Sequence, residues 1–196
     1  MQYWDGTTWV MIPVGKNNTV LRNCDGIPKW VSDHCGNFVI GDTGPAGGFV
    51  FHINDATGLH GLEAAPVDQA ISKGGCNDNN YVGQGTAIGT GLTNTNNILA
   101  SCSDTDIAAR VVQAYSLNGF SDWYLPSMDE LNAMYYRIGK AAVAPLTNIG
   151  AFADSWYLSS SDTGMYLWAE HFGLGYISSY NFPKTQFGNV RAIRSF

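Results

Sequence analysis

The fold of this chain is decided by one stretch, Asp122-Trp123-Tyr124-Leu125-Pro126-Ser127, in which a strand gives way to a helix. Trp123 and Leu125 lie two residues apart, so an extended backbone directs both side chains into the same apolar core. The proline that follows them cannot donate to a strand ladder and ends the strand. Ser127 and Glu130 have the spacing of a capping box, in which each side chain accepts a hydrogen bond from the other residue's backbone amide.

Helical periodicity continues after this stretch and also precedes it. The helix after Ser127 is expected to end at Gly139, with a buried face of Leu131, Met134, Tyr135 and Ile138. An earlier helix is expected between a cap at Ser103 or Asp104 and a stop at Asn118-Gly119, with a buried face of Ile107, Ala108, Val111, Val112 and Tyr115.

Short strands make up the rest of the expected fold. Two precede the helices, at 49–53 and 62–65, and residues 54–102 otherwise have the composition of a loop. Four follow the helices, at Trp156–Ser159, Tyr166–Phe172, Tyr176–Tyr180 and Val190–Ile193. This order predicts an α+β fold with two helices packed on a looped antiparallel sheet.

The first 36 residues contain a weak repeat. Asp5-Gly6 is followed by Trp9-Val10, and Asp25-Gly26 by Trp30-Val31. Asp-Gly between aromatic and β-branched residues is typical of a hairpin turn, so residues 1–36 are expected to form two small hairpins ahead of a ligand-binding domain at 37–196. Hairpins this short have little core, so their Trp residues need cover from the main domain or from a neighbouring chain.

The composition excludes several classes of function. Of the 196 residues only 13% are charged, 23 are Gly, and the net charge is −6, which disfavours a nucleic-acid binder that works by bulk charge. No apolar run reaches the length of a membrane span. The motifs of serine hydrolases, zinc proteases and nucleotide-binding loops are missing, and His34, His52, His60 and His171 match no common metal spacing. The sequence therefore predicts neither an enzyme nor a cofactor.

The four cysteines fall in two local pairs, Cys24 with Cys35 and Cys76 with Cys102. Neither pair has the spacing of a zinc knuckle or a redox site, so two disulfides are expected. Disulfides and the low charge together predict a secreted or cell-surface protein. A structural ion is left open at two polar segments, Asn77–Asn80 and Ser103–Asp106.

Three groups of residues resemble the Lcl C-terminal domain family, named for the globular head of the Legionella collagen-like adhesin. They are Gly41-Asp42-Thr43-Gly44-Pro45-Ala46-Gly47-Gly48 with 58–66, Ile88-Gly89-Thr90-Gly91 with Asn94-Thr95, and 119–127 with Glu130-Leu131. The tail adds Leu158-Ser159-Ser160-Ser161 and Val190-Arg191-Ala192-Ile193-Arg194. The resemblance covers roughly residues 41 to 196.

The resemblance implies a C-type-lectin-like fold whose first and last strands pair. It also implies a bacterial adhesin head that is a homotrimer on a collagen-like stalk and binds sulfated glycosaminoglycans. Formylglycine-generating enzymes share this fold but need a late Cys pair, and no Cys follows Cys102 here. Asn181-Phe182-Pro183 does not reproduce the Glu-Pro-Asn type of calcium and sugar motif.

Two classes of ligand follow from these observations. A sulfated glycan requires clustered cations, and the candidate ligand-binding residues are Arg137, Lys140, Tyr180, Asn181, Lys184 and Arg191. Tyr180, Asn181 and Lys184 are expected to be exposed, whereas one of Arg191 and Arg194 is expected to be buried against a carboxylate. The alternative is a protein-binding display domain that uses the Tyr-, Ser- and Asn-rich residues 157–186. Trp156 and Trp168 are expected in the core.

Overall fold

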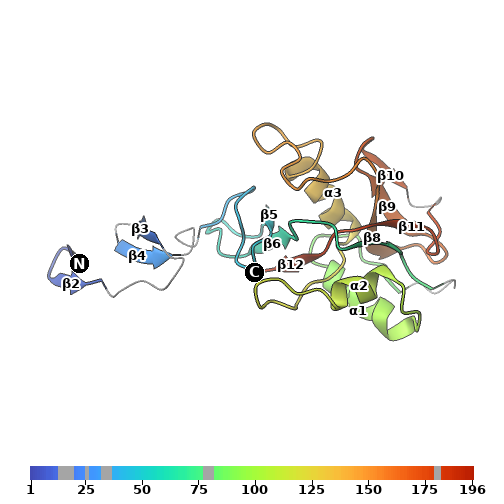
Figure 1. Ribbon diagram of the computed structural model, residues 1–196, viewed down its shortest axis with the longest axis horizontal. Coiled ribbons are helices and arrows are strands. Elements are labelled where there is room, and N and C mark those ends of the chain that lie inside the picture. The colour runs from blue at the N-terminus through green and yellow to red at the C-terminus, as the bar shows by residue number, and fades with distance from the viewer. Residues whose placement is uncertain (13–19, 25–26, 32–36, 77–81, 179–181) are drawn as a thin grey trace.

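The computed structural model describes residues 1–12, 20–24, 27–31, 37–76, 82–178 and 182–196. These residues form an α+β protein in which two small hairpins precede a larger head (Figure 1). The strands are β1 (Gln2–Trp4), β2 (Trp9–Met11), β3 (Val20–Cys24), β4 (Ile27–Val31), β5 (Phe49–Ile53), β6 (Gly61–Ala64), β7 (Ala70–Lys73), β8 (Trp156–Asp162), β9 (Leu167–His171), β10 (Tyr176–Ser178), β11 (Phe187–Val190) and β12 (Ile193–Ser195). The helices are α1 (Gly91–Ser101), α2 (Ala108–Gln113) and α3 (Met128–Arg137).

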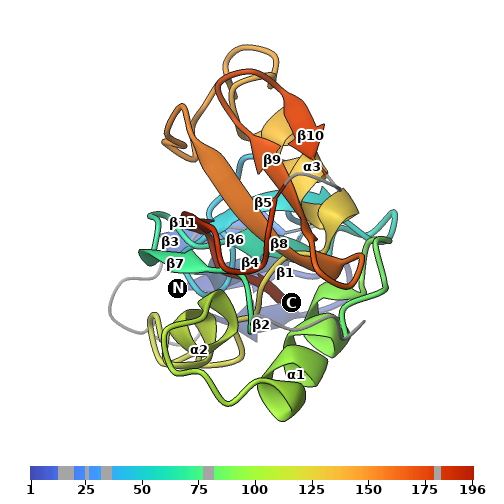
Figure 2. The ribbon, with the colours of Figure 1, turned by 90° about the vertical axis from the view of Figure 1, so that its right-hand side faces the viewer.

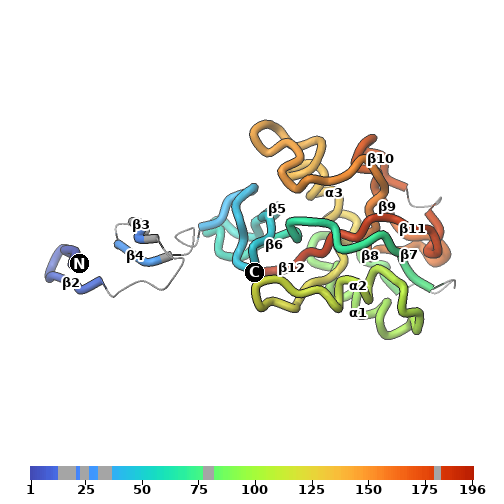
Figure 3. Tube along the Cα trace, viewed as in Figure 1, coloured from blue at the N-terminus to red at the C-terminus, as the bar shows by residue number. Residues whose placement is uncertain are grey.

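The head contains two sheets. One has the strand order β10-β9-β8-β11-β7 and is antiparallel except for the parallel pair β11 and β8; the other has the order β12-β6-β5. Figure 3 shows the chain passing from β11 directly into β12. The single strand expected at Val190–Ile193 is therefore wrong, because Arg191 and Ala192 form the crossing between the two sheets.

Helices cover both faces of the larger sheet, as Figure 2 shows. On one face, Leu158 and Val190 pack with Ile98 of α1 and Val112 of α2. On the other, Tyr157 packs in a second cluster that includes α3. Neighbouring residues of β8 therefore serve opposite cores, as the alternation of a strand requires.

The stretch that ends the strand and starts the helix behaves as its sequence predicts. Trp123 and Leu125 are buried, and Ser127 and Glu130 form the complete capping box of α3. The Glu130 carboxylate also accepts hydrogen bonds from the amides of Gly89, at 2.7 Å, and Gly91. Burial raises the pKa of Glu130, while these backbone amides, with that of Ser127, oppose the shift. One carboxylate therefore caps α3 and the start of α1.

The region before α2 differs from expectation. Residues 54–102 are not mostly loop, because β7 and the eleven-residue helix α1 lie within them, so the described residues contain three helices rather than two. The helix expected from Ser103 or Asp104 starts later, with Ile107 at its cap position. Asp104 and Asp106 instead bind the Lys73 ammonium at 2.8 and 3.0 Å.

A buried ion-pair network joins the distant segments of the head. Arg194 of β12 binds Glu63 of β6 at 2.8 Å and holds Asp122 with two nitrogens, each at 2.8 Å. The other contacts of the fully buried Glu63 carboxylate are the amides of Ala46 and Gly48. The Gly-rich segment 41–48 is therefore a loop wrapped around a carboxylate.

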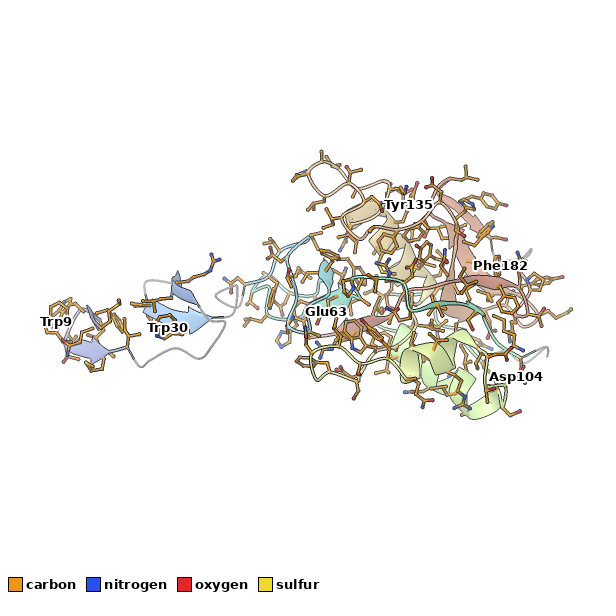
Figure 4. All side chains as sticks on the ribbon, in the orientation of Figure 1. Trp9, Trp30, Glu63, Asp104, Tyr135 and Phe182 are labelled. Atoms are coloured by element: carbon orange, nitrogen blue, oxygen red, sulfur yellow. A yellow bond between two sulfur atoms is a disulfide. The ribbon has the colours of Figure 1, made fainter. Side chains whose placement is uncertain are left out.

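The N-terminal hairpins lie away from the head. The pairs β1–β2 and β3–β4 confirm the two expected hairpins. Figure 4 shows Trp9 and Trp30 at a distance from the head, and their exposed fractions are 63% and 38%. Within the described residues, the head therefore does not cover Trp9, as one of the two expectations required.

The described residues include one of the two expected disulfides. Cys76 and Cys102 form a disulfide that fastens the segment after β7 to the end of α1. The pairing of Cys24 with Cys35 lies outside the described residues. Within the described residues, no helix has the length and apolar character needed to cross a membrane.

Candidate functional site

Two of the predicted ligand-binding cations are buried in internal ion pairs. Arg191 is 1% exposed, binds Asp68 at 2.7 Å, and donates to the carbonyls of Ala65 and Gly150. Lys184 is 5% exposed and lies 3.5 Å from Asp162, so the expectation that it is exposed is wrong. One of Arg191 and Arg194 was expected to be buried, and in the structure both are buried.

The other two predicted cations lie near the end of α3 but contact different elements. Arg137 is exposed and binds His52 of β5 at 2.8 Å. Lys140 is half-buried and pairs with Asp154 at 2.8 Å, and this hydrogen bond lowers the pKa of Asp154. Each of the four cations thus has its own partner, and no contact brings them together as one patch among the residues described. Tyr180 and Asn181 lie outside that part of the chain.

Exposed aromatic and aliphatic side chains gather where α3 meets the edge of the larger sheet. We call this the β10 surface. Trp156, His171 and Tyr176 lie on one face of the sheet edge and Ile177 on the other, while Tyr136 and Leu174 lie beside the turn between β9 and β10. The Trp156 ring lies 5.3 Å from His171 and 6.0 Å from Tyr176, measured between centroids. Leu174 and Tyr176 are well exposed, whereas Trp156 is only half-buried, so the expectation that it belongs to the core is correct only in part.

Tyr135 joins α3 to the rest of the β10 surface. Its ring contacts Tyr136 and, beneath the sheet edge, Phe172. The turn between β9 and β10 closes over the same ring, since a Cβ at Gly175 would lie 2.6 Å from the Tyr135 hydroxyl. Gly175 has a φ of +65°, a conformation that favours glycine. Figure 4 shows Tyr135 on the side of the head that carries this turn.

Lys140 borders the β10 surface through Asp154. A Cβ added at Gly173 would lie within 2.9 Å of the Asp154 side chain, so the ion pair flanks the turn between β9 and β10. Sequence reasoning located part of this surface through the Tyr- and Trp-rich residues 157–186. It missed Tyr136 of α3. The only signal in the sequence that α3 adds a residue to this surface was the neighbouring aromatic residue, Tyr135.

A buried carboxyl group lies in the middle strand of this region. Glu170 of β9 is fully buried, lies opposite Tyr157 and Ile177 in the sheet, and neither of its oxygens has a hydrogen-bond partner among the described residues. Burial raises the pKa of this carboxyl group to about 8. Glu170 is therefore protonated at neutral pH.

The described residues contain one group of potential metal ligands, Cys76, Cys102 and Asp104. Both sulfur atoms belong to the disulfide, so they do not act as thiolate ligands. Asp104 and Asp106 belong to one of the two segments left open for a structural ion. Their carboxylates bind the Lys73 ammonium group instead. The other segment, Asn77–Asn80, lies outside the described residues.

A scan of protein-family models and a search of curated proteins found no match to this chain.

Replacing the buried carboxyl group should change how stability depends on pH. The ordinary pKa of Glu170 is 4.5, and between this value and about 8 the folded protein keeps a proton that the unfolded chain releases. Stability therefore falls as pH rises through that window, by ~4 kcal/mol in total. We expect Glu170→Gln to match the parent at pH 4.5 and to be more stable at pH 9.

Urea unfolding at several pH values measures this effect. Asp129→Asn is the matched control, because Asp129 is an exposed acid on α3. Parallel pH profiles of the parent and Glu170→Gln would contradict the account.

Proposed function

We propose that this chain is the non-enzymatic ligand-binding head of a secreted or surface-exposed bacterial adhesin, with a C-type-lectin-like fold. The resemblance of residues 41 to 196 supports this proposal. The last strand, β12, pairs with β6 of the first hairpin in the head and not with β5, so the pairing of first and last strands that the resemblance implies is not found among the described strands. Phe196 exchanges two backbone hydrogen bonds with Gly61.

The β10 surface carries the proposal for the ligand. Tyr136, Leu174 and Tyr176 are all more than half exposed and lie around one turn that Tyr135 anchors. Large rings on a rigid support, bordered by a charged pair, are the usual centre of a protein-binding surface. The ligand that fits this surface best is a protein. A protein ligand was the alternative to an anionic glycan among the two ligand classes expected from the sequence.

The second candidate ligand is a sulfated or otherwise anionic glycan, such as a glycosaminoglycan. One observation outside the head favours it. Arg22 and Lys29 lie directly opposite each other in the β3–β4 hairpin, and both are exposed. The head itself gives less support, because Lys184 and Arg191 are buried in ion pairs. A glycan site would therefore lie on the hairpin, with Arg137 as the exposed cation of α3.

We propose further that the protein is a homotrimer. The rings of Trp4 and Trp9 form a cross-strand pair whose centroids are 5.6 Å apart, and within the part of the chain that the structure describes they remain 52% and 63% exposed. Packing of these hairpins between three copies buries the rings. It also brings three Arg22–Lys29 pairs together and adds avidity to each head.

The two ligand classes can be separated on cultured epithelial cells. For a protein ligand, we expect binding of labelled protein to be lost after trypsin treatment and retained after heparinase. Tyr176→Ala should weaken it about thirtyfold, the effect of losing a central ring. Phe187→Ala is the matched control, since Phe187 is 58% exposed and Tyr176 55%.

The opposite pattern would reject the protein ligand. An anionic glycan would be established by binding that survives trypsin and is lost after heparinase. Binding of the parent protein should then fall as salt is added, whereas the residual binding of Arg22→Gln/Lys29→Gln should not. Failure of the protein to be retained on heparin at low salt would reject the glycan, because sulfate contacts are strongest there.

The trimer has a direct test in the native mass. Light scattering should give about three times the chain mass of 21.2 kDa. Trp9→Ser/Trp30→Ser should dissociate the trimer without changing the circular dichroism of the helices, which all lie in the head. A monomer at tens of micromolar parent protein would contradict the proposal.

A further inference from the structure

The exposed face of α1 is unusual because it has no charge. The helix contains no acidic or basic residue, and its exposed side chains include Leu92, Thr93, Asn96 and Asn97. Thr and Asn are poor helix formers, and an exposed helical position favours residues such as Lys, Glu or Ala. Thr93, Asn96 and Asn97 therefore disfavour the helix in which they lie. The stability of the fold does not account for these residue types at exposed helical positions.

Two grooves flank this face. The first, of about 450 Å³, lies between α1 and the segment 82–90 and is lined by Gln84, Thr93 and Asn97 among others. The second, of about 250 Å³, lies between α1 and the segment 121–124 and includes Leu92, Asn96 and Trp123. α1 is thus the ridge between two hollows, and its uncharged side chains reach into both.

The hydrogen-bonding groups of these grooves are available to a ligand. The side chains of Gln84, Thr93, Asn96 and Asn97 form no hydrogen bond with any described residue. The one ionised side chain in either wall is Asp122, and both of its oxygens are held by Arg194. The grooves therefore offer many neutral donors and acceptors and no unpaired charge.

The wall of the larger groove is fixed before any ligand arrives. Asn94, buried on the inner side of α1, donates to the Gly85 carbonyl at 2.6 Å and accepts from the Gly85 amide at 3.3 Å. The Glu130 carboxylate holds the same loop at Gly89. A rigid wall lowers the entropy that a ligand loses on binding.

We propose that α1 and its flanking grooves bind an uncharged, hydroxyl-rich ligand, namely a neutral oligosaccharide. A side-chain amide donates and accepts at once, and it therefore matches adjacent sugar hydroxyls. Leu92, which is 48% exposed, gives one groove an apolar side for the C–H face of a sugar ring. A sulfated or phosphorylated ligand finds no cation here. The site is separate from the β10 surface and does not depend on the ligand proposed for it.

Amide NMR of the full chain tests the site with four neutral probes, namely cello-, malto-, chito- and galacto-oligosaccharides at millimolar concentration. We expect saturable shifts in α1 and Gln84–Thr90 with at least one probe, unchanged by added salt. Thr93→Ala/Asn97→Ala removes two hydrogen-bonding groups and should weaken binding about tenfold or more. Since Ala favours the helix, this variant should stay folded. Gln186→Ala, an exposed amide remote in sequence from α1, is the control and should bind normally.

Two results would overturn the proposal. One is the absence of saturable shifts with all four probes under conditions in which the spectrum shows folded protein. The other is binding that maps to the β10 surface or is unaffected by Thr93→Ala/Asn97→Ala, which would place sugar recognition elsewhere.

Discussion

The pairing of Arg194 with Glu63 is the interaction on which the rest of the head depends. The two residues face each other across β12 and β6, and both side chains are buried. Glu63 uses its remaining capacity to hold the Gly-rich loop, and Arg194 uses its own to hold Asp122 at the start of the stretch that leads into α3. A buried charge that loses its partner costs about 3–5 kcal/mol, so the stability of each of these segments depends on the others.

The same arrangement determines which surfaces remain for binding. Internal pairs hold Arg191, Arg194 and Lys184, the basic side chains of the last part of the chain, so the sheet crossing and the last loop offer no cationic patch. Glu130 fixes the start of α1 and of α3 with one carboxylate. Two surfaces remain prominent on the described head: the β10 surface, rich in exposed rings, and the uncharged face of α1.

The elements that could be predicted from the sequence are those set by local signals. The capping box of Ser127 and Glu130, the Asp-Gly hairpins and most of the late strands depend on residues a few positions apart. By contrast, the cap residue of α1, Thr90, makes no capping hydrogen bond with its own side chain, and the helix is rich in Thr and Asn. It is held by Asn94 and Glu130 through contacts with distant loops, which no local pattern reveals.

The candidate site was harder to predict for the same reason. The carboxylates that bury Arg191 and Arg194 lie 123 and 131 residues earlier in the sequence, so the sequence predicted one buried arginine but neither its partner nor the burial of both. A weak signal was present, because Val190, Ala192 and Ile193 make the neighbourhood of both arginines apolar. The aromatic composition of residues 157–186 was informative, whereas the partner face of α3 became visible only in three dimensions.

The most direct test of this account is a double-mutant cycle on Glu63→Gln and Arg194→Met, measured by urea unfolding. Arg194→Met should lose about 3–5 kcal/mol, because it leaves the buried Glu63 carboxylate without its partner. Glu63→Gln should lose less, because Arg194 keeps its two hydrogen bonds to Asp122. The double variant should lose at least ~2 kcal/mol less than the sum of the two, because both charges are then gone. Losses that add, or single losses within about 0.5 kcal/mol of zero, would contradict the claim that this pair holds the head together.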